Sequence, residues 1–594
     1  HPRHLAGLGI EHSGKPLLLD AACELPSSAP GRRTGHQIKF HVVAFRSLLF
    51  EPKSRRSANA VQSHLWLLVM NADWLLMGDI PARAARLWGD DLALAFREQR
   101  WTHRQFAEDV DRVAKGLLAL GLAQGDHVAV WMTNRPEWLH LMYAIPRVGA
   151  CIVPLNTRYR TDDVAYTVIQ SQSRFLISID QSGPINYGEM LADASAQIIE
   201  GGYLEAIVML GEHLPDTIGW ESMIESGKSV STEALATRAG AVTVEDRMML
   251  AYTSGTTGHP KGVVHSHKPV RNTAERAMLL GHSKNDVHMS YLPLFHAYGF
   301  SEVAMMAALT GGSQVLFDVF DPDEVLDAVE KENGTVLHGF DSHWADLTRA
   351  QKLQARDVSS LRVGTLPAGM ESTVPVAREV QDLFCPTTSG FGMSETWAFI
   401  ASSHLSDSLE QRVEASGYPM YGIEFQIRDL DDGRELQAGE TGALFVRGYT
   451  VTSGYWGKPE ATAEVFDADG WLDTGDVASI RPDGHVVFVG RHKDMLKVGG
   501  ENVSPAEVEG YLLNVEGIEE IAVVGYPDDR LVEVPVAFVV ASSQLSGDEI
   551  LERCRGKIAS FKIPRHVIFI DEMPTTPSGK IRKVELREWA KTRL

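Results

Sequence analysis

The stretch YTSGTTGHPKG, from Tyr252 to Gly262, decides how the rest of the chain is interpreted. Gly255 and Gly258 let the backbone turn without Cβ clashes, so that several N–H groups can converge on anionic oxygens. Lys261 adds a positive charge, and hydroxyl donors are supplied by Thr253, Ser254, Thr256 and Thr257. The stretch therefore predicts a loop that wraps a triphosphate.

The spacing of this loop differs from that of ordinary nucleoside triphosphatases. Lys261 is followed by Gly262, where G-x-x-x-x-G-K-[ST] would have a hydroxyl residue for magnesium, so another group must carry the metal. The apolar run 248–251 before the loop predicts a buried strand, and residues 263–267 follow it. The loop then lies at the end of an element, where ligands gather in α/β folds. These flanks disfavour the alternative of a plain Gly/Ser/Thr linker.

Composition limits the class of protein. The chain has 594 residues, too many for one core, and a formal net charge of −22, which disfavours nucleic acid as a partner. Apolar runs are too short to span a bilayer, so we expect no integral membrane segment. The scattered cysteines form no C-x-x-C pair, which argues against a zinc site or a disulfide framework and fits a cytoplasmic location. They are Cys23, Cys151, Cys385 and Cys554.

The first 69 residues differ from the rest. They are rich in Arg, His, Ser and Pro and show no sustained hydrophobic period, so we expect 1–69 to be a disordered or non-native extension, with a transit peptide as the alternative. A natural start at Met70 would fit. Beyond it, 101–106 opens a predicted amphipathic helix that runs through Leu120, and 127–131 predicts a buried strand.

Downstream, strands and helices alternate as in parallel α/β sheets, and two motifs stand out. YLPLFHAYG places His296 between aromatic residues, and GFGMSET contains Phe391, Ser394 and Glu395. An aromatic ring can stack on a purine, a hydroxyl can donate to phosphate, and a carboxylate is an oxygen ligand that phosphate-bound Mg²⁺ accepts. Taken alone, a histidine such as His296 is more often a hydrogen-bonded core residue, and Ser394 with Glu395 often only begins a helix.

Three further motifs follow. GWLDTGD ends in Asp476, whose carboxylate suits two ribose hydroxyls, although T-G-D alone also describes a turn. GRHKD follows a predicted strand over 486–489 and contains Arg491 and Lys493. PTTPSGK sets Lys580 in a loop of the kind where most lysines are simply solvated.

In this order and at these separations, the motifs resemble those of the acyl-activating adenylate-forming superfamily (AMP-binding enzymes), most of all acyl-CoA synthetases, or CoA ligases. The resemblance covers about residues 70–592. It implies an α/β fold: a large N-terminal domain of two α/β subdomains plus a β-barrel over 70–490, and a small mobile α+β C-terminal domain over 491–594. It also implies an ATP-dependent acyl-CoA synthetase. A carboxylic acid and ATP give acyl-AMP and pyrophosphate, and a thiol then displaces AMP, because the mixed anhydride is a better electrophile than a carboxylate.

The resemblance also implies roles for individual residues. The loop through Lys261 would hold the β and γ phosphates, Glu395 would bind Mg²⁺, and Lys580 would bridge the acid and the α-phosphate in the transition state. The candidate catalytic residues are His296, Ser394, Glu395 and Lys580. The candidates for binding nucleotide or acceptor are Thr253, Ser254, Gly255, Thr256, Thr257, Gly258, Lys261, Phe391, Asp476, Arg491, Lys493, Gly499 and Gly500. Among these, Phe391 would flank adenine, Asp476 with Arg491 would bind ribose, and Lys493 would be the hinge that swings the small domain.

The segment KVGGENVSPAEVE, residues 497–509, resembles that of acyl-CoA synthetases for medium, aromatic or bulky acids, so the expected cofactors are ATP, Mg²⁺ and coenzyme A. Lys497, Arg491 and Lys562 would form a positive cluster for a phosphorylated carrier. Adenylation for a carrier-protein thiol is one alternative, although peptide-synthetase units carry F-D-x-S where this chain has residues 294–297. A luciferase-like oxygenase is another; a decayed binding protein is disfavoured because no catalytic group is missing. The sequence leaves open a homodimer.

Two segments depart from the family pattern. Ala368-Gly369-Met370 stands where relatives usually read G-A-P, and 340–342 reads F-D-S where they often read V-P-T. Both are expected to line the acyl pocket. Asp341 then indicates either an acid that bears a polar group, because an unpaired buried carboxylate is costly, or a cap on the next helix, and we weigh the two equally.

Overall fold

The computed structural model describes residues 74–212, 214–253, 260–370, 373–498, 501–528, 531–542, 545–555, 558, 560–576 and 581–594. The predicted extension over 1–69 lies outside them. So do the centre of the predicted triphosphate loop, residues 254–259, together with Gly499, Gly500 and Lys580. At Lys493 only the backbone is described. The predicted domain boundaries remain predictions.

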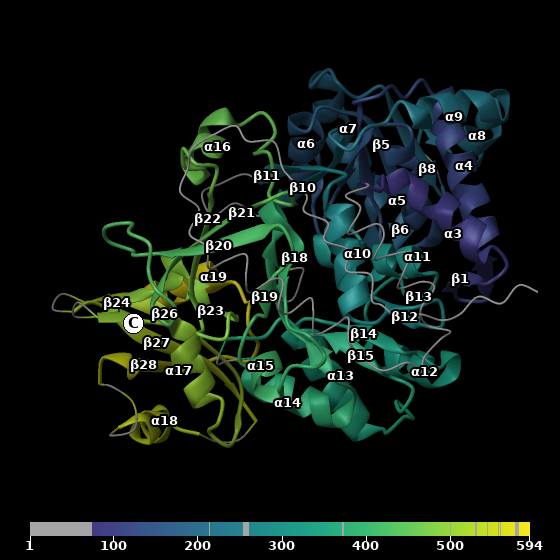
Figure 1. Cartoon of the computed structure of the whole chain (residues 1–594). Helices are drawn as coiled ribbons and strands as arrows, with labels where there is room; N and C mark the ends of the chain where they lie inside the picture. Colours follow the sequence, from purple (N-terminus) through teal and green to yellow (C-terminus); the bar gives the residue numbers. More distant parts are fainter. Residues whose placement is uncertain are drawn as a thin grey trace, which may run out of the picture. The chain divides into compact units, whose positions relative to one another are not determined.

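The first α/β region is built on a seven-stranded sheet in the order β11-β10-β4-β3-β5-β8-β9 (Figure 1). Its strands are β3 (His127–Trp131), β4 (Cys151–Pro154), β5 (Ser173–Ile179), β8 (Ala206–Leu210), β9 (Ile218–Gly219), β10 (Arg247–Thr253) and β11 (Lys261–Ser266). Neighbouring strands are parallel except β10 and β11, which form an antiparallel hairpin at one edge. The two strands predicted for this sheet, β3 and the centre of β10, are buried as expected.

Helices accompany this sheet: α3 (Ile80–Trp88), α4 (His103–Ala119), α5 (Pro136–Arg147), α6 (Thr161–Gln170), α7 (Tyr187–Glu200), α8 (Trp220–Ser226) and α9 (Thr232–Gly240). The predicted helix is α4, but it begins two residues later than expected. Thr102 caps it: its hydroxyl accepts the N–H of Gln105 (3.2 Å), whose side chain accepts the N–H of Thr102 (2.9 Å). The helix ends before Gly121, whose φ of +88° suits glycine.

The second α/β region is another seven-stranded sheet, in the order β16-β15-β14-β12-β13-β1-β2. Its strands are β1 (Leu92–Phe96), β2 (Gln99–Thr102), β12 (Val287–Ser290), β13 (Ser313–Leu316), β14 (Val336–His338), β15 (Val363–Thr365) and β16 (Thr387–Thr388). Only β1 and β2 pair in antiparallel fashion. Its helices are α10 (Pro269–Leu279), the π-helix η3 (Gly299–Met305), α11 (Met306–Thr310), α12 (Pro322–Glu332), α13 (Asp341–Leu353) and α14 (Val374–Leu383).

Two antiparallel sheets correspond to the predicted β-barrel. One contains β17 (Gly390–Met393), β18 (Trp397–Ser402) and β19 (Tyr418–Pro419), and the other β20 (Ile423–Arg428), β21 (Thr441–Gly448), β22 (Leu472–Ile480) and β23 (Val486–Arg491). Phe391 and Ile400 of the first sheet and Phe425 and Leu444 of the second belong to the same hydrophobic core, so the two sheets enclose one interior. The short helices α15 (Leu409–Val413) and α16 (Pro459–Val465) lie in the connections.

The C-terminal region is a small α+β unit. Its sheet contains β24 (Leu496–Val498), β25 (Glu501–Val503), β26 (Ile518–Asp528), β27 (Val532–Ala541) and β28 (His566–Phe569), with helices α17 (Pro505–Leu512), α18 (Gly547–Cys554) and α19 (Lys583–Arg593). Successive residues of β26 face opposite sides, as the strand period requires. Val523 joins the core that contains residues of α17 and α18, whereas Val524 joins the core that contains residues of α19.

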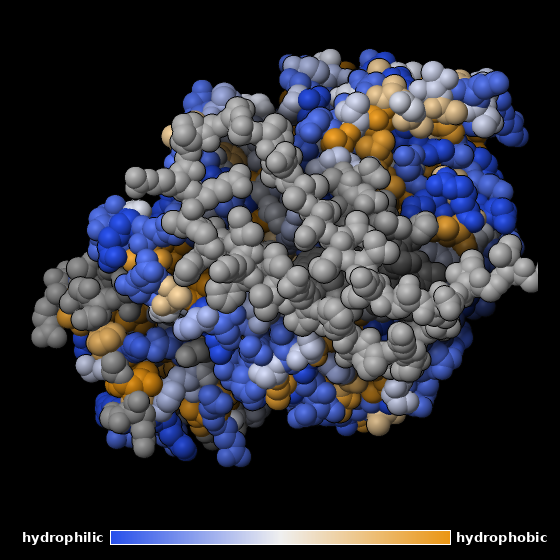
Figure 2. Space-filling view, in the orientation of Figure 1, coloured by the Kyte–Doolittle hydropathy of each residue, from blue (hydrophilic) through white to orange (hydrophobic). Residues whose placement is uncertain are grey.

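Cys151, Cys385 and Cys554 are buried and unbridged. Burial raises the pKa of the Cys151 and Cys385 thiols to about 12. Among the described residues we find no helix with the length and apolarity needed to traverse a bilayer. Figure 2 shows hydrophilic residues over much of the coloured surface on one face, with hydrophobic groups scattered between them.

Candidate active site

The hairpin β10–β11 carries the two described ends of the predicted triphosphate loop. Thr253 pairs with Lys261, and Tyr252 pairs with Gly262, so the ends are fixed opposite each other. A Cβ on Gly262 would lie 3.0 Å from the Tyr252 ring, so a larger residue there would require the ring to shift. The hairpin confirms that the loop lies at the end of a buried strand, although that strand is the antiparallel partner of the next one.

Ser394 and Glu395 form a single 3₁₀ turn, η4 (Ser394–Thr396), between β17 and β18. Glu395 is 8% exposed, so its carboxylate lies inside the protein. The turn ends at Trp397, whose φ of +78° and ψ of −178° fall in a region that side chains rarely adopt. The buried indole compensates this strain, because its N–H donates to the Thr273 hydroxyl (3.2 Å).

The segment 452–456 joins the turn to the hairpin. The N–H of Thr452 donates to the Glu395 carbonyl oxygen (2.7 Å), and the Tyr455 hydroxyl donates to the Glu395 carboxylate (2.9 Å). The same segment pairs with β11, where the N–H of Trp456 donates to the Gly262 carbonyl oxygen (2.8 Å). Lys261, Ser394 and Glu395 are thereby brought to one place.

Two more contacts complete this arrangement. A ring nitrogen of His265, on β11, lies 2.6 Å from the carbonyl oxygen of Ser394. Burial lowers the pKa of His265 to about 4, so the ring is neutral at physiological pH. The ammonium of Lys261 lies 4.8 Å from the centroid of the Tyr455 ring. Neither His265 nor Tyr455 was predicted from the sequence, and residues 454–456, G-Y-W, carry only a signal typical of packing.

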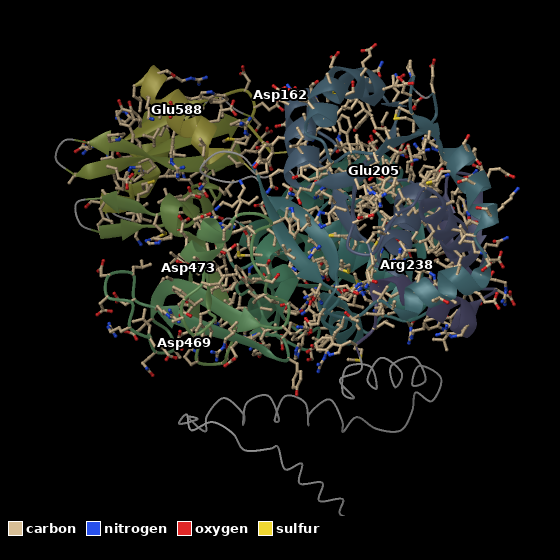
Figure 3. The ribbon with its side chains drawn as sticks, turned by 90° about the horizontal axis from the view of Figure 1, so that it is seen from above. Asp162, Glu205, Arg238, Asp469, Asp473 and Glu588 are labelled. Atoms are coloured by element: carbon tan, nitrogen blue, oxygen red, sulfur yellow. The ribbon has the colours of Figure 1, made fainter. Side chains whose placement is uncertain are left out.

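Asp476 and Arg491 face each other on the paired strands β22 and β23. The guanidinium Nε lies 2.8 Å from the Asp476 carboxylate, which is 1% exposed. Asp473, on the same strand and labelled in Figure 3, is exposed and accepts the N–H of Gly475 (2.9 Å). The acid that the D-T-G-D run buries is therefore Asp476. The structure therefore brings these two predicted residues together. Lys493 follows on a 3₁₀ turn, η5 (His492–Asp494).

His296 and Phe391 lie in aromatic surroundings. The Nδ1 of half-buried His296 accepts the N–H of Tyr298 (3.2 Å), and its ring centroid lies 5.8 Å from that of Phe340. The Phe391 ring is buried, 5.9 Å from the Phe488 ring. Sequence reasoning anticipated an aromatic setting for His296 but not the core position of Phe391.

Two expectations about charges can be compared with the structure. Asp341 is exposed as the first residue of α13, and its Oδ1 accepts the N–H of Ser342 (2.9 Å), so its carboxylate is not buried, and the polar group on the acid stays a prediction. Asp341 belongs to the helix start, although Phe340 occupies the N-cap position itself. Two members of the predicted positive cluster lie in ion pairs, Lys562 with Glu507 and Arg491 with Asp476, and the cluster itself stays a prediction.

The described side chains around Glu395 are compatible with Mg²⁺ but do not form a cage of ligands. Within the described ranges, no group of three or more His, Cys, Asp or Glu side chains is arranged to hold one. Mg²⁺ does not need such a cage, because it is usually bound by one or two carboxylates together with waters and substrate phosphates. The single buried carboxylate of Glu395 beside the triphosphate hairpin fits this pattern.

The chain combines two α/β sheets, an antiparallel β region and a small α+β unit. The β10–β11 hairpin, which carries Lys261, lies beside the turn η4, which carries the buried Glu395. This fold and this site define an enzyme of the adenylate-forming class. The chain belongs to the family of AMP-binding enzymes: residues 81–456 match the model for the AMP-binding enzyme, and residues 507–580 match that for the AMP-binding enzyme C-terminal domain.

Similar proteins agree with this family. A feruloyl-CoA synthase of an Amycolatopsis species is 33% identical over 516 residues, which cover 86% of this chain and 98% of the relative. The structure of the anthranilate CoA ligase AuaEII in complex with anthranoyl-AMP matches with a TM-score of 0.77 and 27% identity, covering 88% of this chain and 98% of that one. The structure of ATP-bound MatB from Rhodopseudomonas palustris matches with a TM-score of 0.75 and 27% identity. The match covers 86% of this chain and 99% of that one.

The chain is accordingly an ATP-dependent, AMP-forming acid–thiol ligase of the acyl-CoA synthetase type. Its substrates are a carboxylic acid, ATP and coenzyme A, and Mg²⁺ is the ion that accompanies the nucleotide. The predictions of family, fold class and reaction are confirmed.

Proposed function

We propose that this ligase activates a ring-bearing carboxylic acid and that the residues predicted from the sequence carry the reaction. The observation that carries the proposal is the meeting of two motif segments and the segment 452–456 around Lys261 and the buried Glu395 carboxylate. A cation and a carboxylate held side by side suit a metal-bound triphosphate, because the cation can face phosphate oxygens while the carboxylate faces the metal.

In this proposal the loop from Thr253 to Lys261 holds the outer phosphates and Ser394 donates to the α-phosphate. Glu395 would hold Mg²⁺, which when bound neutralises charge on the phosphate oxygens. Lys580 reaches the α-phosphate and the acid, where a positive charge offsets the charge that develops in the transition state. No protein nucleophile is needed, because the acid itself attacks.

Asp476 and Arg491 are proposed to hold the ribose. The ion pair between them (2.8 Å) fixes the carboxylate in one orientation. An oriented carboxylate can accept hydrogen bonds from two vicinal hydroxyls. Arg491 lies two residues before Lys493, the proposed hinge, so the same strand end would connect nucleotide binding to the movement that admits the thiol.

The ring-bearing acid is proposed from the aromatic set that follows β12 and β14. Phe340 lies within contact range of Tyr298 (centroids 4.8 Å apart) and His343 (5.8 Å, stacked). Burial lowers the pKa of His343 to about 4, so the ring is neutral and can pack against an apolar acid. The names of two similar proteins, a feruloyl-CoA synthase and an anthranilate CoA ligase, support an aromatic acid.

Pyrophosphate release over a panel of short, fatty, aryl and ring-bearing acids, each with and without coenzyme A, tests the proposal. We expect the aryl and other ring-bearing acids to give a higher kcat/KM than the short and fatty acids, and we expect turnover to require coenzyme A. Adenylation that never yields an acyl-CoA would favour a carrier-protein thiol, and light emission with a luciferin would favour an oxygenase. The cytoplasmic location and the homodimer also belong to this proposal, and cell fractionation and light scattering test them.

A further inference from the structure

Tyr455 touches two of the proposed nucleotide-binding groups at once. Its hydroxyl donates to Oε1 of Glu395 (2.9 Å), and the ammonium of Lys261 lies 4.8 Å from its ring centroid. These contacts use different parts of one side chain. A hydroxyl can orient a carboxylate, whereas an aromatic face attracts a cation.

The backbone around Tyr455 is fixed to both partners. Tyr455 bridges Val263 across an antiparallel pair, and the N–H of Val264 donates to the Gly454 carbonyl oxygen (3.1 Å). Three residues earlier, the N–H of Thr452 donates to the carbonyl oxygen of Glu395 (2.7 Å). Main-chain hydrogen bonds on each side therefore hold the ring between β11, which carries Lys261, and the turn η4, which carries Glu395.

The chemistry of the phenol suits this position. A tyrosine hydroxyl carries its proton at physiological pH, so at 2.9 Å from Oε1 of Glu395 it acts as a hydrogen-bond donor. It occupies one lone pair of the Glu395 carboxylate and leaves the others for a metal.

We propose that Tyr455 is a positioning residue: its hydroxyl orients the Glu395 carboxylate toward Mg²⁺ and its ring holds Lys261, so that one side chain sets the distance between the metal and the outer phosphates. This role rests on the proposed function of Glu395 and Lys261. It predicts that substitutions can separate the effect of the hydroxyl from that of the ring. The hydroxyl acts through Glu395 on Mg²⁺, whereas the ring acts through Lys261 on the outer phosphates.

The test uses ATP and Mg²⁺ as probes, so the acid need not be known. Thermal shifts of the full chain are measured with ATP in a chelator and then during titration with Mg²⁺. Tyr455→Phe keeps the ring, so ATP binding without metal is expected to stay within 2-fold of wild type, while the apparent Mg²⁺ constant rises about 10-fold or more. Tyr455→Leu is expected to show the same Mg²⁺ defect and, in addition, about 3-fold weaker ATP binding without metal.

Tyr187→Phe is the matched control. It removes a hydroxyl that donates to the Thr157 carbonyl oxygen (3.0 Å) outside this site, and it should leave both constants unchanged. An unchanged Mg²⁺ constant in Tyr455→Phe would overturn the inference. So would a 10-fold effect of Tyr455→Phe in a Glu395→Gln background, because a hydroxyl that acts through Glu395 should have little effect once the carboxylate is removed. A wild-type chain that binds ATP with no response to Mg²⁺ would instead refute the proposed function itself.

Discussion

Glu302→Gln should destabilise the protein strongly, because it breaks an ion pair buried between two motif-bearing segments. Arg276 lies on α10, which follows the β10–β11 hairpin. Glu302 lies on the π-helix η3, which follows the motif that contains His296. Their side chains are 1% and 0% exposed, with the guanidinium Nε 2.8 Å from the carboxylate. The guanidinium carbon of Arg276 also lies 4.4 Å from the centroid of the Phe399 ring.

The magnitude follows from this burial. Glutamine keeps the volume and one acceptor of glutamate, so the change creates no cavity but removes the carboxylate charge that is paired with the buried guanidinium. Breaking a buried pair by removing one partner costs about 3–5 kcal/mol. Because glutamine retains an acceptor, we expect the lower end, about 3 kcal/mol. The double variant Arg276→Met/Glu302→Leu removes both charges and should cost less than Glu302→Gln alone.

Urea unfolding at neutral pH, followed by tryptophan fluorescence, measures this loss. A chain of several domains does not unfold in one step, so the wild type and the variant are compared by the midpoint of the transition in which the region around Trp397 unfolds. The m value of this transition should be the same in both proteins. Glu414→Gln is the control: its pair with Arg378 is exposed, with side chains 42% and 41% accessible, and should cost less than about 1 kcal/mol. Equal losses in Glu302→Gln and Glu414→Gln would refute the reasoning.

Three further outcomes are expected. Lys580→Ala should lower adenylate formation about 10²–10³-fold while supplied acyl-adenylate is still converted to thioester; equal loss of both half-reactions, measured by pyrophosphate and acyl-CoA, would contradict the assignment. Lys493→Pro, which fixes φ near −65°, should spare adenylate formation and block thioester formation, so full acyl-CoA synthesis by this variant would argue against a hinge. Burial raises the pKa of Glu275 to about 7 from an ordinary 4.5. Protonation of Glu275 therefore stabilises the folded protein, and this stabilisation is fully present below pH 4.5 and is lost as the pH rises through 7. Glu275→Gln removes this titration, so its free energy of unfolding in urea should rise by up to about 3 kcal/mol relative to that of the wild type between pH 5 and pH 8. A difference in free energy of unfolding that does not change with pH would contradict this expectation.

Local patterns predicted the elements well where the signal is local. The apolar run 248–251 became the buried centre of β10, as a short apolar run that ends in a Gly-rich loop predicts. The helix through Leu120 was predicted with an early start, because Trp101 fits its apolar face; the reciprocal Thr102–Gln105 hydrogen bonds decide where it begins. The expectation for Asp341 failed in part because the burial of a side chain depends on packing that neighbouring letters do not reveal.

The candidate site was predicted through its motifs, but the contacts that join them were not. Tyr455 and Glu395 are 60 residues apart, and Lys261 is more distant still from either, so no window of sequence contains the contact. His265 is similar: its hydrogen bond to Ser394 spans 129 residues. The roles of the loop centre and of Lys580 fall on residues outside the described ranges and stay predictions.

The buried cysteines have a practical consequence for an enzyme that handles a thiol. With pKa values near 12, the sulfhydryls of Cys151 and Cys385 remain protonated at assay pH and are poor nucleophiles. Neither should compete with coenzyme A for an activated acyl group, so self-acylation at these positions is disfavoured. A disulfide reagent added to the native enzyme should accordingly leave these two positions unmodified while it titrates free coenzyme A.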